Sequence, residues 1–242
     1  AWFEHQGMQS FPLWAVGSLL ALNLSVWWLP NRKEAVQHDE VRPPVMAVLR
    51  QRKVQWFFVT VFFHVLSHIG LYVFFSLYLD ALGYSKVWIG VLWATSVIVE
   101  IAWFFTQSKW LHRLSLTAWL VVSSAAMTLR MGMTAQFADI LWVLLLAQAL
   151  HALTFAANHT VCVALLSHYF PGQLRGRGQA LYTVIAYGFP GMLGGVVGGL
   201  LSDRLGLQSV YWVSMATALI GTLASYKVWR LHHPLEKFPG AH

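Results

Sequence analysis

The chain has 242 residues, of which 57% are hydrophobic and only 10% are charged. Soluble domains carry about a quarter charged residues, so this composition excludes an ordinary soluble domain and indicates a membrane protein. One cysteine excludes a disulfide framework, and the net charge of +7 is a membrane-orientation signal before it is a sign of nucleic-acid binding.

Seven mostly apolar stretches are long enough to cross a hydrocarbon core of about 30 Å. They lie at about residues 11–29, 54–79, 87–106, 116–133, 138–170, 179–201 and 207–226. They must be helices, because backbone groups in lipid need partners within their own segment, and the alternation of a transmembrane β-strand is absent from them. The predicted fold is an all-α membrane protein with seven transmembrane helices.

The loops between these spans carry a strong charge asymmetry. Thirteen of the 16 Lys and Arg residues fall on one side, Lys86 and Arg204 fall on the other, and Arg130 lies inside a span. Because Lys and Arg concentrate in cytoplasmic loops, the N-terminus is predicted to lie outside and the C-terminus in the cytoplasm. Membrane orientation thus explains the basic charge, and no nucleic-acid partner is expected.

The start of the chain predicts a preceding segment. The chain begins at Ala1 without a signal peptide, although its first span should begin outside. The only long polar loop contains Pro43 and Pro44 and mixed charges, as a linker would. We therefore expect the last helix of an absent N-terminal half at 1–30, a cytoplasmic linker at 31–53, a complete six-helix domain at 54–230 and a cytoplasmic tail at 231–242.

Four stretches resemble the major facilitator superfamily, whose members have two six-helix halves. GYSKVWIG at 83–90 resembles the entry to helix eight, and RGRGQALY at 175–182 resembles the loop before helix eleven. GGVVGGLLSDRLG at 194–206 resembles the end of helix eleven and its turn into helix twelve, whereas FTQSKWLHRLS at 105–115 occupies the basic loop motif without its Gly and Asp. The resemblance implies helix six plus the C-terminal six-helix half of a twelve-helix transporter.

Two longer stretches resemble a narrower group, the bacterial phenylpropionate permeases, which are relatives of lactose permease. These are YLDALGYSKVWIGVLWATSVIVEI at 78–101 and LHALTFAANHTVCVALLSHYF at 150–170. This resemblance implies a bacterial inner-membrane protein, and it implies an aromatic acid as the solute, with sugars and nucleosides left open.

Lactose permease carries a carboxylate, an Arg and a His–Glu pair on its eighth to tenth helices, for sugar and proton. Arg130 and His151 match the Arg and the His, but Thr154 stands at the position of the Glu. Glu100 lies about one turn from the position of the eighth-helix carboxylate. The resemblance therefore does not transfer the whole proton apparatus.

Ionisable side chains inside spans are functional candidates, because a charge at the bilayer centre costs about 2.5–3.5 kcal/mol. Glu100 lies about 20 Å below the outer face at 1.5 Å per residue, and His151 lies at a similar depth. We predict both as proton-coupling residues, since the charge of a carboxylate at that depth depends on which side has access, and histidine titrates near working pH. The alternative for each is a structural hydrogen bond between helices.

A polar stripe runs along the fifth span. At 100° per residue, Gln148, His151, Phe155 and Asn158 share an arc of about 100°, together with His159. Polar stripes on membrane helices face the bundle interior or a water-filled path. We expect the first four to bind substrate, with interhelical hydrogen bonding as the alternative.

Four further residues complete the predicted substrate site. His64 and His68 share one helix face at a spacing that also suits a metal, but no Cys or Asp cluster offers further ligands, so no metal or cofactor is expected. Trp93, like Phe155, either stacks on a ring of the solute or simply packs against its neighbours. Arg130 either binds an anionic substrate in the cavity, or it extends to the outer surface or pairs with Asp139.

The sixth span combines glycines with a proline. Gly191 with Gly195, and Gly195 with Gly199, form faces that permit close helix contact. Pro190 is expected to kink or loosen the helix, because it lacks a backbone N–H.

The predicted function is a proton-coupled secondary transporter that moves a small organic solute by alternating access, and not an enzyme. Its expected partners are the solute, protons, the lipid bilayer and the missing N-terminal half. The sequence contains no phosphate-binding loop, so ATP is not expected to drive transport through this chain. One alternative is a His-based metal or haem enzyme. Membrane haem families usually space their paired histidines nearly four turns apart on a helix, and the intervals of 4, 8 and 9 residues here disfavour that arrangement. Another is a non-transporting receptor or assembly subunit.

Overall fold

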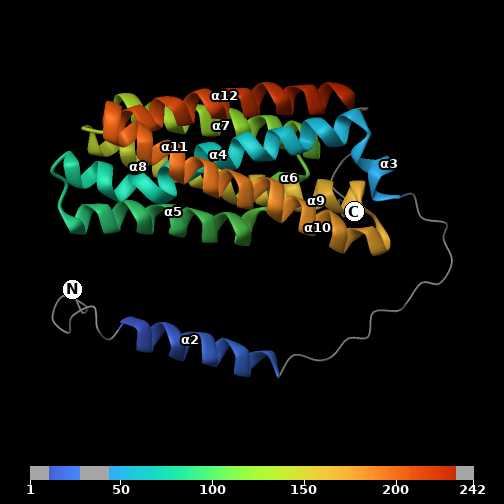
Figure 1. Cartoon of the computed structure of the whole chain (residues 1–242), viewed down its shortest axis with the longest axis horizontal. Helices are drawn as coiled ribbons and strands as arrows, with labels where there is room; N and C mark the ends of the chain where they lie inside the picture. The colour runs from blue at the N-terminus through green and yellow to red at the C-terminus, as the bar shows by residue number, and fades with distance from the viewer. Residues whose placement is uncertain (1–10, 28–43, 233–242) are drawn as a thin grey trace. The chain divides into compact units, whose positions relative to one another are not determined.

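A computed structural model describes residues 11–27 and 44–232, and the regular elements in those ranges are all helical (Figure 1). Six segments of this described part of the chain are long and apolar enough to cross a membrane. They are α4 (Arg52–Ala81), α5 (Lys86–Thr106), α7 (Leu116–Gln136), the fifth-span segment Leu141–Tyr169, the sixth-span segment Gly172–Leu205 and α12 (Leu207–Leu231). The last six predicted spans are thereby confirmed. The largest boundary difference is in the sixth span, where helical turns begin at Gly172.

The first predicted span is only partly confirmed. Helix α2 (Phe11–Val26) is apolar but has 16 residues, and residues 28–29 of the predicted span lie outside the described part of the chain. The chain divides into two compact units, Ala1–Arg42 and Pro43–His242. Most of the predicted linker and the tail from residue 233 onward also lie outside the described residues, and α3 (Val45–Leu49) falls within the linker range.

Short polar signals set the helix ends. Ser85 caps α5 by accepting a hydrogen bond from the Trp88 N–H at 3.4 Å, and Ser115 caps α7 through the Ala118 N–H at 3.2 Å. A short helix, α6 (Ser108–Leu111), precedes α7. Gly206 has a φ of 83° between α11 (Phe189–Leu205) and α12, a conformation that glycine adopts without steric penalty.

In the second unit, α12 packs against both α4 and α7 (Figure 1). Helix α11 packs on α4, and α5 packs on the fifth span. Buried apolar side chains form two clusters, one containing Phe57 and the other containing Phe75. Between these positions on α4 lie His64, Ser67 and His68, which are buried and polar. The two apolar clusters therefore leave a polar stretch near the middle of the helix.

The fifth and sixth spans each contain a π-helical turn. The fifth runs as α8 (Leu141–Ala149), η2 (Ala152–Ala157) and α9 (Asn158–Tyr169), so its residues do not follow the uniform 100° step used to predict the polar stripe. The sixth runs as η3 (Gly172–Leu174), α10 (Arg175–Tyr182), η4 (Thr183–Gly188) and α11. Pro190 lies two residues after the end of η4. Its missing N–H and its ring disfavour a normal turn back to Ala186, which accounts for the widened turn there.

The glycine faces of α11 differ from the prediction. A Cβ atom at Gly194 would lie 2.8 Å from Ile69 Cγ2, and one at Gly198 would collide with the Phe74 ring. Added Cβ atoms at Gly191, Gly195 and Gly199 would meet no atom within 4 Å among the described residues. The contact between α11 and α4 therefore uses Gly194 and Gly198, and not the two predicted pairs.

Gly194→Ala should destabilise the bundle, because the new methyl group overlaps Ile69 and overpacking costs about 1–3 kcal/mol. A thermal unfolding scan in detergent should show a melting temperature lower by several degrees. Gly195→Ala is the matched control on the neighbouring face, where the methyl group has space. An equal fall in both variants would contradict the packing of α11 on α4.

Candidate functional site

Arg130 on α7 is buried, with 2% of its surface exposed. Its Nη1 atom donates to His151 Nδ1 at 3.0 Å and to Thr154 Oγ1 at 2.9 Å. Its Nη2 atom donates to Gln148 Oε1 at 2.6 Å. This geometry excludes extension to the surface, and Asp139 is exposed rather than paired with Arg130. Arg130 therefore lies inside the bundle, and the binding of an anionic substrate there stays a prediction.

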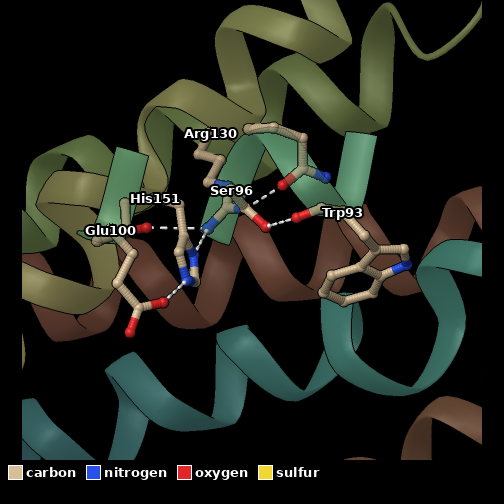
Figure 2. Close-up of polar contacts among 7 residues, drawn as sticks. Trp93, Ser96, Glu100, Arg130 and His151 are labelled. Carbon is tan, nitrogen blue, oxygen red and sulfur yellow. Dashed lines mark hydrogen bonds and ion pairs between the residues drawn. The ribbon is translucent and has the colours of Figure 1, made fainter. Parts of the chain in front are cut away.

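The guanidinium has no direct carboxylate partner among the described residues. All three of its hydrogen bonds go to neutral acceptors, and its Nε atom is buried without a partner. A buried charge without a counter-ion is strongly unfavourable. The nearest negative charge in this network is Glu100, one histidine away (Figure 2).

His151 connects Arg130 to Glu100 on α5. Its Nε2 atom lies 3.2 Å from Glu100 Oε2, while its Nδ1 atom faces Arg130 (Figure 2). Because a guanidinium only donates, Nδ1 must accept, and the single proton of the neutral ring is on Nε2, where it is donated to the carboxylate. The Glu100 side chain is 25% exposed and that of His151 is 7% exposed. The carboxylate is therefore the most exposed member of this hydrogen-bonded series.

The π-helical turn η2 forms hydrogen bonds with two neighbouring helices, through one side chain and one backbone carbonyl. The Thr154 hydroxyl accepts from Arg130 of α7, and the Thr154 carbonyl accepts from His64 Nε2 of α4 at 2.7 Å. Single π turns inside α-helices are frequent at functional sites. Asn158, just after the turn, donates to Ser123 of α7 at 2.8 Å.

A small open pocket lies beside this cluster, between α4, the η2–α9 segment and η4. Its lining includes His64, His68, Phe155 and Asn158 of the predicted site. Phe155 stacks on His151 with ring centroids 5.0 Å apart, and His68 contacts both of these rings edge-on. The pocket is therefore continuous with the Arg130 cluster and has an aromatic wall.

Most of the predicted site residues lie together in the structure, although their roles remain predictions. Glu100, Arg130, Gln148 and His151 are joined by hydrogen bonds. The adjoining pocket is lined by His64, His68, Phe155 and Asn158. Trp93 does not line it. Its indole donates to Ser76 at 3.0 Å and stacks on Tyr72.

Sequence reasoning missed Tyr72 and Tyr187, which also line the pocket. Tyr72 lies four residues after His68, so the spacing that linked His64 to His68 would also have found it. Tyr187 lies in η4, and no spacing within its own span indicated that it would meet the histidines. Within the described ranges, no three His, Cys, Asp or Glu side chains are grouped to hold a metal.

Comparison with known proteins agrees with the resemblance found in the sequence. The MFS_1 like family matches residues 2–213. The probable 3-phenylpropionic acid transporter of Escherichia coli (strain K12) is 29% identical over 153 residues, which cover 63% of this chain and 40% of that relative. The chain thus spans well under two thirds of the length of that relative. The family match covers most of the chain and excludes the membrane-enzyme alternative. The chain belongs to the MFS_1-like family of multi-pass membrane transporters.

Proposed function

We propose that the full-length protein is a secondary transporter that carries one organic monocarboxylate together with one proton. The observation that carries this proposal is the chain from buried Arg130 through His151 to the partly exposed Glu100. It holds one fixed positive charge and one partly exposed carboxylate. The positive charge of Arg130 can balance the negative charge of a substrate only when Glu100 is protonated.

Charge balance then couples the binding of the substrate to the binding of the proton. With Glu100 ionised, its carboxylate accepts the His151 Nε2 proton and offsets the charge of Arg130. When Glu100 binds a proton, that N–H is released and the guanidinium loses its counter-ion. The carboxylate of the substrate accepts the same N–H and restores neutrality. Either ligand alone leaves a net charge inside the membrane, which disfavours movement of a half-loaded carrier.

Of the two predicted proton-coupling residues, this geometry favours Glu100 as the carrier. Arg130 occupies the Nδ1 side of His151 at 3.0 Å and can only donate. His151 therefore cannot take a second proton while that contact lasts. We assign His151 a connecting role: it accepts from Arg130 at Nδ1 and offers its Nε2–H at the exposed end of the hydrogen-bonded series.

An aromatic acid is the first candidate substrate. The relative from Escherichia coli is named for 3-phenylpropionic acid, a monocarboxylate with one ring. In this chain the pocket beside His151 has a stacked wall that includes Phe155, and a ring is the group that such a wall accommodates best. Gln148 and Thr154 hold the guanidinium in place.

The proposed setting is the bacterial inner membrane, with the C-terminus in the cytoplasm. Thirteen of the 16 basic residues support that orientation by the positive-inside rule. The chain would supply helix six and the C-terminal half, and the preceding half would complete the substrate site near the midplane. Rocking of the halves around that site would give alternating access.

Glu100→Gln should abolish proton-driven accumulation and keep substrate exchange, because Gln resembles the protonated carboxyl group and leaves the site able to bind an anion. The full-length protein in liposomes should show no uphill uptake of 3-phenylpropionate under a proton gradient. Its counterflow should become independent of pH. The exposed Asp80 at the end of α4 provides the control Asp80→Asn. Unchanged accumulation in Glu100→Gln would remove this residue from the mechanism.

Arg130→Gln should remove the preference for a carboxylate, because it eliminates the fixed positive charge. Wild-type protein should bind 3-phenylpropionate at least tenfold more tightly than its uncharged amide, as measured by competition. In Arg130→Gln the two should bind within about twofold of each other. Arg113→Gln, at an arginine packed on Trp110 instead, is the charge-matched control. A retained acid preference in Arg130→Gln would place the anion site elsewhere.

A further inference from the structure

We propose that His64 is a positioning residue for the anion site, which acts through Thr154 to hold the guanidinium of Arg130 in place. This role differs from the direct substrate contact that the sequence predicts for His64. The inference rests on the proposed function, and it adds to that function a residue that determines the preference for acids.

The π-helical turn η2 diverts one backbone donor away from Thr154. The backbone N–H of Asn158 is paired with the carbonyls of Leu153 and Phe155. In a regular α-helix this N–H would pair with the carbonyl of Thr154, four residues back. Thr154 is only 1% exposed, and a buried carbonyl without a partner is unfavourable. The Thr154 carbonyl therefore needs a replacement donor.

His64 on α4 supplies that donor. Its Nε2 atom lies 2.7 Å from the Thr154 carbonyl oxygen, which can only accept, so Nε2 carries the proton. His64 is 3% exposed, and its Nδ1 atom has no hydrogen-bond partner among the described residues. The contact with Thr154 is thus the one hydrogen bond of this imidazole ring within the described part of the chain.

The backbone of α4 is closely packed at this level. A Cβ atom added to Gly221 of α12 would lie 3.4 Å from the His64 backbone nitrogen and 3.6 Å from the Thr60 carbonyl oxygen. Close packing of this kind leaves the backbone little freedom to shift. His64 therefore extends from a firmly held helix to the π turn of the fifth span.

Thr154 links His64 to the cation. Its carbonyl accepts from His64, and its hydroxyl accepts from Arg130 Nη1 at 2.9 Å. The same Nη1 atom donates to His151 Nδ1 at 3.0 Å, and its two hydrogens allow both contacts. A change in the backbone at Thr154 would therefore alter the hydrogen bonds that orient the guanidinium.

The fifth span is bonded to α7 on both sides of the π turn. Before the turn, Gln148 and His151 accept from Arg130, and after the turn Asn158 donates to Ser123 at 2.8 Å. Without His64, the backbone N–H of Asn158 can return to the Thr154 carbonyl. The π turn would then become regular helix, and its two sides would rotate relative to each other by one residue step, about 100°. The two sets of contacts with α7 could not both survive that rotation.

Three substitutions at His64 test this role in the full-length protein. His64→Phe keeps a ring and removes the donor. Gln carries an amide N–H about as far from the backbone as Nε2, whereas Asn ends one bond shorter, at the level of Nδ1. The preference for 3-phenylpropionate over its uncharged amide, measured by competition, should fall from about tenfold to about threefold or less in His64→Phe and His64→Asn. His64→Gln should restore the preference.

Melting temperatures in detergent report on the same contact without any substrate. His64→Phe and His64→Asn should melt several degrees below wild type, because the Thr154 carbonyl loses its donor, and His64→Gln should recover most of the loss. The exposed His112 provides the control His112→Phe, in which both the melting temperature and the acid preference should stay as in wild type.

An acid preference that persists in His64→Phe would overturn the positioning role, while the anion site at Arg130 would stand. Equal weakening of the acid and of the amide would also overturn it, because that result indicates direct substrate contact or a general defect in folding. Failure of His64→Gln to restore the preference would show that the N–H donor is not what matters, and would overturn it too. Absence of any acid preference in the wild-type protein would instead overturn the proposed function, and the role of His64 with it.

Discussion

The burial of the Arg130 guanidinium is the constraint on which the polar interior of this bundle depends. A charge held in a low-dielectric interior must be surrounded by hydrogen-bond acceptors and must lie near an opposite charge. The structure provides the acceptors from the fifth span and the opposite charge from α5, through His151. Three helices are therefore fixed relative to one another by one cation. The apolar clusters along α4 pack on both sides of this level rather than through it.

The π-helical turn η2 makes this arrangement possible. Its Thr154 contributes the hydroxyl to Arg130 and the backbone carbonyl to His64, so one residue joins α7 to α4. A second π turn, η4, brings Tyr187 to the same pocket. Both turns depart from regular helix geometry and place groups in contact with neighbouring helices. They lie in a part of the bundle where the proposed transport would require the helices to rearrange.

Sequence reasoning could identify the spans and the charged residues, because both follow from the cost of placing polar groups in lipid. Length and hydropathy located six spans to within a few residues, except at the start of the sixth, and rarity in apolar surroundings selected Glu100 and Arg130. It could not determine which side chains meet. The partners of Arg130 depend on the register between helices and on the extra residue of η2. The choice between two interleaved glycine faces on α11 depends on where Ile69 and Phe74 pack.

Under the proposed function, the same charge count favours an acid over a sugar at this site. By its resemblance to lactose permease, the position of Thr154 would hold a glutamate, and a second carboxylate there would neutralise the guanidinium permanently. A neutral sugar would then be the natural ligand. Threonine keeps the hydrogen bond to Arg130 at 2.9 Å but contributes no charge. One cation thus faces a single carboxylate that can be protonated, and the remaining unit of negative charge is left for the substrate to supply.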